Sequence, residues 1–216
     1  MTNKEIIAKG ITANHSGKML GMSSYSTACT MCKACIKAHN TDNDLSVCKH
    51  CYSFRMLKRY KALREKLERN YEFITQTEIQ LADVPFINTA IFRFEAFGDL
   101  ANAVQFRNYV LIALANENTT FTLWTKRPYV IENAFSSYDI PKPKNLIIVY
   151  SEPIINKAWT EPDYTSIRKI YPFIDKVFTV HNGDTDININ CGARKCAECR
   201  LCYSHNDVHI INELLK

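Results

Sequence analysis

The sequence lacks any long hydrophobic run. No apolar stretch approaches the roughly 20 residues that a membrane-spanning helix needs, so we predict no contact with a membrane. The first residues, Met-Thr-Asn-Lys-Glu-Ile-Ile-Ala-Lys, also lack the apolar segment of a secretory signal, and we expect a cytoplasmic protein. The chain of 216 residues is 46% hydrophobic and 23% charged, which is ordinary for a globular protein with its own core.

Cysteine is absent from residues 52–190, although the chain contains nine cysteines. The nine fall into an N-terminal group (Cys29, Cys32, Cys35, Cys48 and Cys51) and a C-terminal group (Cys191, Cys196, Cys199 and Cys202). Both groups end in Cys-x-x-Cys-Tyr-Ser. An odd number cannot pair completely, and thiols stay reduced in the cytoplasm. Because Cys-x-x-Cys places two thiolates on one tight turn, the pattern predicts a metal or a cluster.

The spacing of the C-terminal group indicates which metal to expect. Cys196, Cys199 and Cys202 follow at three-residue steps, as in ferredoxin-type cluster loops, whereas structural zinc sites more often use two separated Cys-x-x-Cys pairs. We therefore predict iron–sulfur clusters of the [4Fe–4S] type and keep zinc as the alternative. In the N-terminal group, Cys29/Cys32 or Cys32/Cys35 together with Cys48/Cys51 would suit zinc. Cys29/Cys35 together with Cys48/Cys51 could hold a cluster. The sequence leaves open whether the two groups form two sites or share one.

Between the two groups, strands and helices alternate. Strands are expected at 86–94, 120–125, 145–150 and 176–180, with helices at 102–117, from Pro128 and at 164–171. Four strands joined by helical crossovers predict a parallel α/β sheet. The chain is short for an eight-stranded barrel of ~250 residues. We therefore predict a partial, open parallel β/α barrel with cysteine-rich metal-binding segments at both ends.

The whole chain, 1–216, is expected to form a single domain. Its parts are an N-terminal cysteine segment (22–52), a basic amphipathic helix (53–82), the β/α core (86–184) and a C-terminal cysteine loop (185–204). Residues 1–69 carry a net charge of +8, against −3 for the remainder. The basic part of the helix, 55–69, could contact nucleic acid phosphates, and a solvated helix face is the plainer alternative.

Polar residues follow the expected strands, where active sites of parallel α/β folds form. The candidate catalytic residues are Glu95, Asp99 and His181. The candidate cofactor-binding residues are Gly98, Asp99, Lys126 and Arg127. Simpler roles compete with each: Asp99 could cap a helix beginning near Leu100, Lys126 and Arg127 could be surface charges, and Asn182-Gly183 could be a plain turn between His181 and Asp184.

Several of these motifs together resemble the phage and prophage proteins of the gene-product-88 family, over about residues 22–204. They are Cys29-x5-Cys35, Cys48-x-x-Cys51-Tyr52, Arg93…Gly98-Asp99, Thr125-Lys126-Arg127 and the closing four-cysteine loop. The resemblance implies metal binding in the cytoplasm of a host cell. It also implies the ligands Cys29, Cys35, Cys48, Cys51, Cys191, Cys196, Cys199 and Cys202, with Cys32 as the extra cysteine. It supplies no reaction and no substrate.

A looser likeness links the chain to radical S-adenosylmethionine enzymes, which combine a partial barrel with a [4Fe–4S] cluster. Gly98 and Asp99 would stand where those enzymes hold the amino group of S-adenosylmethionine. Their Cys-x3-Cys-x2-Cys signature is absent here. The leading hypothesis is thus an iron–sulfur protein with a redox or radical-type reaction at the strand ends, acting on a small-molecule or macromolecular substrate. The alternatives are a zinc-stabilised nucleic-acid-binding protein and a host-interaction protein with purely structural metal sites.

Overall fold

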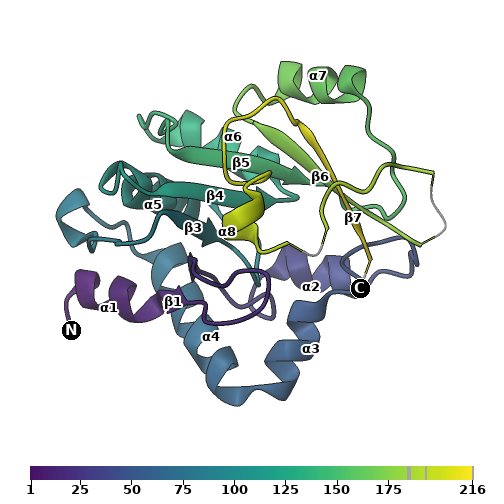
Figure 1. The fold of residues 1–216 in the computed structure, drawn as a ribbon. Coiled ribbons are helices and arrows are strands. Elements are labelled where there is room, and N and C mark those ends of the chain that lie inside the picture. The colour runs from purple at the N-terminus through teal and green to yellow at the C-terminus, as the bar shows by residue number, and fades with distance from the viewer. Residues whose placement is uncertain (184–185, 193, 216) are drawn as a thin grey trace.

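The computed structural model describes residues 1–183, 186–192 and 194–215. A seven-stranded sheet runs through the molecule in the order β1-β2-β3-β4-β5-β6-β7 (Figure 1). Its strands are β1 (Thr12–Ala13), β2 (Ser23–Tyr25), β3 (Ile91–Phe94), β4 (Thr120–Thr125), β5 (Leu146–Ser151), β6 (Lys176–His181) and β7 (Ile210–Leu214). Only β1 pairs antiparallel to its neighbour; β2 to β7 are parallel.

The helices are α1 (Asn3–Gly10), α2 (Lys33–His39), α3 (Tyr52–Arg59), α4 (Lys61–Gln76), α5 (Ala103–Leu114), α6 (Pro128–Ser137), α7 (Glu161–Ile170) and α8 (Cys196–Cys199), with one 3-10 turn, η1 (Leu81–Asp83). Local sequence explains several helix starts. Asn102 caps α5 by accepting a hydrogen bond from the Gln105 backbone N–H. Pro128 opens α6 at a position where its missing N–H costs nothing.

The two faces of the sheet bury different partners. Phe92, Phe94, Phe121 and other side chains of one face pack against α1, α4, α5 and α6 in the main core. Side chains on the opposite face of the sheet, such as Ile147 and Val149 of β5, pack instead against the C-terminal cysteine segment. We call this second face the inner face. Figure 1 shows α8 on one side of β3 and β4 and α5 on the other.

The predicted parallel α/β sheet is confirmed, and three strands were not foreseen. Strands β1, β2 and β7 come from the two cysteine-rich ends of the chain, where no alternating pattern indicated a strand. The expected strand at 86–94 is shorter, because β3 begins at Ile91.

The expected single helix over 53–82 is wrong, because the chain bends at Tyr60, whose backbone is extended (φ −113°, ψ 96°). Leu57 on α3 and Leu67 on α4 are nevertheless both buried in one cluster with Cys29, as the single apolar stripe of the sequence predicts.

No helix in the described part of the chain is both long and apolar enough to cross a membrane.

Candidate functional site

The N-terminal cysteines gather after β2 and at the starts of α2 and α3. Cys29 and Cys32 are 2% and 1% exposed, and Cys35, Cys48 and Cys51 are partly buried. Cys29 packs in a small cluster with Ala28, Leu57 and Leu67, against which Cys35 also packs. The fold therefore brings five thiols together, including the predicted spare, Cys32.

The thiols of this group perturb one another in pairs. The Cys29 thiol lies beside Cys51 and lowers the pKa of Cys51 to about 5, helped by the backbone N–H groups at the start of α3. In the same way the Cys35 thiol, with Arg127 as a further cause, lowers the pKa of Cys32 to about 6. The contacts raise the pKa of Cys29 and Cys35. The arrangement thus favours two thiolates within the group.

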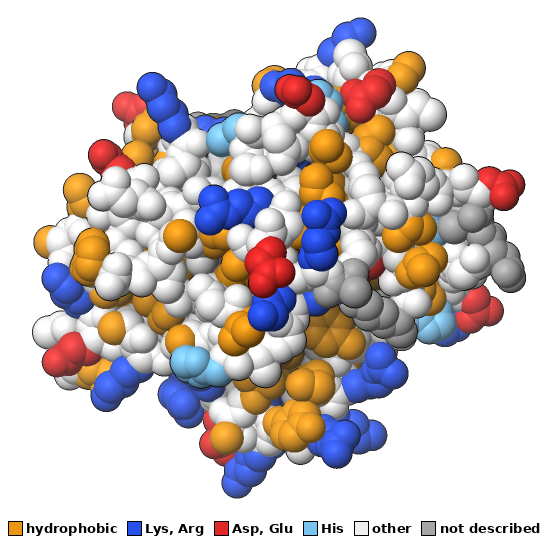
Figure 2. All heavy atoms as spheres, in the orientation of Figure 1, with side chains coloured by type: hydrophobic (Ala, Val, Ile, Leu, Met, Phe, Trp, Pro, Cys, Tyr) orange, Lys and Arg blue, Asp and Glu red, His pale blue; other side chains and the backbone are white. Residues whose placement is uncertain are grey.

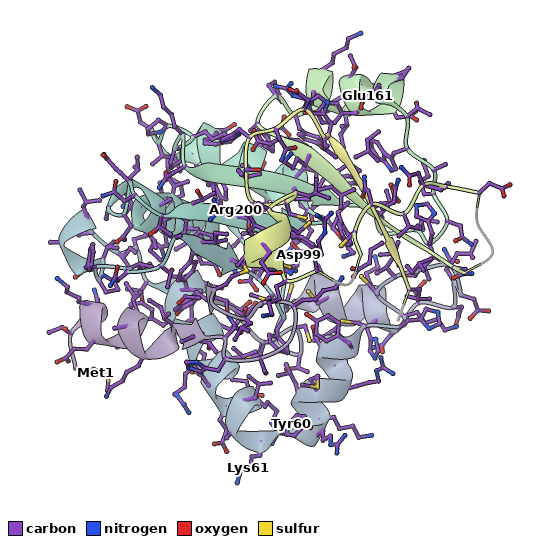
Figure 3. The ribbon with its side chains drawn as sticks, in the orientation of Figure 1. Met1, Tyr60, Lys61, Asp99, Glu161 and Arg200 are labelled. Carbon is purple, nitrogen blue, oxygen red and sulfur yellow. The ribbon has the colours of Figure 1, made fainter. Side chains whose placement is uncertain are left out.

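Asp99 and the basic residues Lys126 and Arg127, which follow β4, lie near these thiols. The Asp99 carboxylate accepts hydrogen bonds from Thr125 Oγ1 (2.5 Å), the Leu100 N–H (2.7 Å) and the Lys126 N–H (3.0 Å). The Cys32 thiol and burial raise the pKa of Cys35, and burial raises that of Cys48; the Asp99 charge adds to both shifts. Asp99 is labelled in Figure 3, in the interior of the molecule. It does not cap α5, whose N-cap is Asn102.

Lys126 and Arg127, at the end of β4, lie near different thiols of the N-terminal group. Lys126 Nζ donates to Ser151 Oγ on β5 (3.0 Å), and its charge lowers the pKa of Cys48 against the larger effect of burial. Arg127 donates to the carbonyls of Leu100 and Ala101 and lies 3.9 Å from Cys32 Sγ. Both cations thus face the N-terminal thiols.

Glu95 is a buried positioning residue. It is 2% exposed, and its backbone adopts a left-handed conformation (φ 53°) directly after β3. Its carboxylate accepts hydrogen bonds from the Thr27 N–H (3.1 Å), Thr27 Oγ1 (3.0 Å), Gln105 Nε2 (2.6 Å) and the Tyr109 hydroxyl. Burial raises the pKa of Glu95 to about 7 in spite of these donors. Because Thr27 lies two residues before Cys29, Glu95 fixes the approach to the first thiol.

Gly98 completes this packing. A Cβ atom at Gly98 would lie 2.4 Å from Glu95 Oε2 and 2.5 Å from Thr27 Oγ1. Such distances are too short for a real side chain, so glycine is required for the loop to close over Glu95. The structure therefore gives Gly98 a packing role, and it brings Glu95, Gly98 and Asp99 into one loop beside the N-terminal thiols.

The C-terminal cysteines pack on the inner face of the sheet. Cys202 is 6% exposed, and Cys191 and Cys196 lie partly buried against the same cluster. Burial raises the pKa of Cys202, and the neighbouring thiols Cys191, Cys196 and Cys199 raise it further. Cys29 and Cys202 belong to different packed clusters, while Tyr52 and Tyr203, which follow Cys51 and Cys202, both lie near Arg93.

A segment near the N-terminus holds the C-terminal group in place. The Cys196 N–H donates to the Lys18 carbonyl (2.7 Å), and Lys18 Nζ lies 3.6 Å from Cys191 Sγ. Lys18 also forms a 2.5 Å ion pair with Glu213 on β7. Residues before β2 and after β6 therefore meet at this group.

His181 lies apart from the residues above. It ends β6 with no exposed surface, its Nε2 is 2.7 Å from Thr179 Oγ1, and burial lowers its pKa. Thr179 Oγ1 in turn donates to Asn212 Oδ1 on β7 (2.7 Å). This chain of contacts joins two strands. Asp184, predicted with His181, lies outside the described residues.

Sequence reasoning missed Thr27, Gln105 and Tyr109, which hold Glu95, and Lys18. Neither spacing nor a motif marks these residues, because their role arises only when distant segments meet. Arg93 and Tyr203 were noticed as parts of motifs, without a role. The shared Cys-Tyr ending was a usable signal, since the side chains of Tyr203 and Tyr52 both lie near Arg93.

The donor set fits a thiophilic metal in chemistry and charge. Each group supplies at least four cysteines, and each has a lysine or arginine within 4 Å of a sulfur, at 3.6 Å from Cys191 and 3.9 Å from Cys32. In the described ranges, however, no three His, Cys, Asp or Glu side chains are already arranged to hold a metal ion. Metal binding would therefore require the thiols to move together.

The fold and site define a mixed α/β protein with a seven-stranded, mostly parallel sheet and two groups of cysteines. The model of the gene product 88 family matches residues 1–205, so the chain belongs to this phage protein family. The resemblance drawn from the cysteine and strand-end motifs is confirmed. No curated protein and no solved structure is significantly similar to the chain.

Proposed function

We propose that this gene product 88 protein binds iron–sulfur clusters of the [4Fe–4S] type through its two cysteine groups, on an open β/α barrel in the host cytoplasm. The observation that carries the proposal is the gathering of the nine cysteines into two groups, each with a cation near a predicted ligand: Lys18 at Cys191 and Lys126 at Cys48. Thiolates are the ligands of such clusters, and nearby positive charge offsets theirs.

An iron–sulfur cluster would supply one-electron transfer at the carboxyl ends of the strands. The protein's own residues would hold and orient the ligands. Glu95 holds Thr27, and thereby the backbone leading to Cys29, through two hydrogen bonds. Arg127 and Lys126 offset the charge of Cys32 and Cys48.

A radical reaction with S-adenosylmethionine is the finer form of this proposal. The amino group of S-adenosylmethionine would need an acceptor, and Asp99 was its candidate. The Asp99 carboxylate already accepts three hydrogen bonds from the chain, so its capacity for a further donor is small. We therefore propose redox chemistry first. Adding S-adenosylmethionine to the purified, loaded protein and recording the visible spectrum tests the finer form.

The proposal is tested by purifying the protein without oxygen and measuring iron, acid-labile sulfide and visible absorption. We expect brown protein with iron and sulfide in equal amounts. Cys48→Ser and Cys199→Ser should each remove about half of the iron, whereas Cys32→Ser should retain it. A colourless protein that holds only stoichiometric zinc overturns the iron–sulfur proposal.

A specific observation also favours a second function, nucleic acid binding at the bend between α3 and α4. Tyr60 is 44% exposed there, and the Arg59 guanidinium lies 5.3 Å from its ring centre. Arg55, Lys58 and Lys61 are exposed on the same two helices. Figure 2 shows Lys and Arg side chains gathered at this lower end of the molecule, and Figure 3 labels Tyr60 and Lys61. An exposed aromatic ring among cations suits stacking on a base beside phosphates.

This second function is tested by titrating single-stranded and double-stranded oligonucleotides at several salt concentrations. Lys61→Gln should weaken binding and lower the salt dependence by about one charge, while Tyr60→Ala should weaken single-strand binding with the salt dependence unchanged. Lys169→Gln on α7 is the matched control. Affinity that does not change with salt refutes phosphate contact, and a protein with neither redox activity nor nucleic acid binding points to a host-interaction role.

A further inference from the structure

Four buried polar atoms on the inner face lack a hydrogen-bond partner among the described residues. They are Arg93 Nε, Thr122 Oγ1, Trp124 Nε1 and Tyr203 Oη, and they make up half of the eight such atoms in the described chain. Arg93 and Thr122 are direct neighbours in the β3–β4 register. Buried donors without acceptors are rare, because each costs the free energy of a lost hydrogen bond. Their concentration in one place requires an explanation.

Arg93 is the centre of this group of donors. Its guanidinium lies 3.9 Å from the centre of the Trp124 ring, a stacking contact that fixes its direction. The side chain is partly buried, and none of the ion pairs in the described part of the chain includes it. Tyr203, Tyr52 and Cys202 are its polar neighbours, and burial raises the pKa of the Tyr203 phenol and the Cys202 thiol, so both are uncharged. A buried arginine is usually paired with a carboxylate, whereas Arg93 has thiol and phenol groups as neighbours.

A second cation stands on the same face. Lys176 is 1% exposed and donates to Asn206 Oδ1 (2.9 Å) and the Val208 carbonyl (2.7 Å). Burial lowers the pKa of Lys176, and Cys202 is one of its neighbours, as it is of Arg93. Three cations therefore lie near the C-terminal thiols: Lys18 is beside Cys191, and Arg93 and Lys176 are neighbours of Cys202. The Glu213 carboxylate near Cys191 is paired with Lys18, whereas the Asp99 carboxylate near the N-terminal thiols accepts its hydrogen bonds from uncharged donors.

We propose that the inner face is built to stabilise an anionic metal–thiolate centre at the C-terminal cysteine group, with Arg93, Trp124 and Tyr203 as donors toward its sulfur atoms. This inference rests on the proposed function, since it assumes that Cys191, Cys196, Cys199 and Cys202 bind metal. Four thiolates give a bound Zn²⁺, Co²⁺ or [4Fe–4S]²⁺ a net negative charge. Hydrogen bonds and cations directed at the sulfurs then raise the affinity and ease reduction.

The test uses Co²⁺ as the probe metal, because its absorption with thiolates reports the sulfurs bound. The reduced full chain, freed of metal, is titrated as wild type, Arg93→Gln, Arg93→Lys and Arg168→Gln. Arg168 is the matched control, since its guanidinium also stacks on a ring, that of Tyr164 on α7, away from the cysteines. Wild type should bind two ions. Arg93→Gln should lower the affinity for one of the two Co²⁺ ions by about 10–100-fold, the range found for groups that support metal ligands. Arg93→Lys should recover part of the loss.

Thermal unfolding of the same metal-free proteins separates a structural role from the proposed one. A guanidinium without an anionic partner does not stabilise the metal-free chain, so Arg93→Gln should unfold at the same temperature as wild type or higher. If Arg93 only supports packing on Trp124, the variant unfolds earlier and, where folded, binds Co²⁺ with wild-type affinity; that result overturns the inference.

Two further outcomes distinguish the inference from the proposed function. If wild type binds neither Co²⁺ nor Zn²⁺, metal binding itself fails. If wild type binds two ions and Arg93→Gln binds both equally well, only the role of Arg93 fails. Should Arg93→Gln not fold, Tyr203→Phe removes a single donor and should weaken the same site by a smaller factor; unchanged affinity there is the negative result.

Discussion

Replacing Glu95 with glutamine should remove a pH dependence from the stability of this protein. Burial raises the pKa of Glu95 from 4.5 to about 7. Between these pH values the folded protein holds a proton that the unfolded chain has released. Stability from this group is therefore complete below pH 4.5 and is lost as the pH rises through 7. At about 1.36 kcal/mol per pKa unit, the loss amounts to about 3 kcal/mol.

Glutamine keeps the shape of the side chain without its titration. At pH 4.5 we expect Glu95→Gln to be less stable than wild type by about 1–3 kcal/mol, because an NH2 group replaces one of the two oxygens and then faces donors. Between pH 4.5 and pH 8 the difference should move by about 3 kcal/mol in favour of the variant. Wild type and variant would then have similar stabilities in mild alkali.

Urea unfolding followed by circular dichroism at four pH values measures this difference directly. Glu132→Gln on α6 is the control, since Glu132 is exposed and its variant should follow wild type throughout. A wild-type advantage that stays constant, or grows, with rising pH would refute the reasoning. It would mean that the four donors around the carboxylate outweigh the cost of burying its charge.

Three further predictions concern the same loop and its thiols. Gly98→Ala should destabilise the protein by about 1–3 kcal/mol in thermal unfolding, because its Cβ would meet Glu95 Oε2 at 2.4 Å, whereas Gly183→Ala, with open space around it, should have little effect. Asp99→Asn should cost about 1–3 kcal/mol in urea unfolding, since an amide group cannot accept from all three donors that the carboxylate satisfies. Cys32→Ser should leave the metal content unchanged while serine at any other N-terminal cysteine lowers it; a loss of metal in Cys32→Ser would show that Cys32 is a ligand.

The central part of the fold was predictable because its strands have simple patterns. Residues 145–150 form a nearly continuous apolar run, and the buried strand β5 lies there. The ends of the chain gave no such pattern. Strand β2 reads Ser-Ser-Tyr, and its three residues are buried because β1 and β3 flank it. Short strands of this kind depend on their neighbours, so local sequence does not identify them.

The candidate site was predictable to a similar degree. The rule that polar residues gather at the carboxyl ends of parallel strands correctly grouped Glu95, Asp99, Lys126 and Arg127. It did not show that the Glu95 carboxylate faces inward, because that depends on Gln105 and Tyr109 from α5. The helix bend at Tyr60 also escaped prediction, since neither proline nor glycine marks it.

The two cysteine groups share a sequence ending but not an electrostatic environment. The N-terminal thiols lie near the Asp99 carboxylate as well as near Lys126 and Arg127. The C-terminal thiols face Arg93 and Lys176, and where Glu213 comes near Cys191 it is paired with Lys18. If both groups hold the same kind of cluster, positive charge at the C-terminal group favours the more negative, reduced state there. A repeated motif would then give two centres of different potential, and electrons would rest at the C-terminal one.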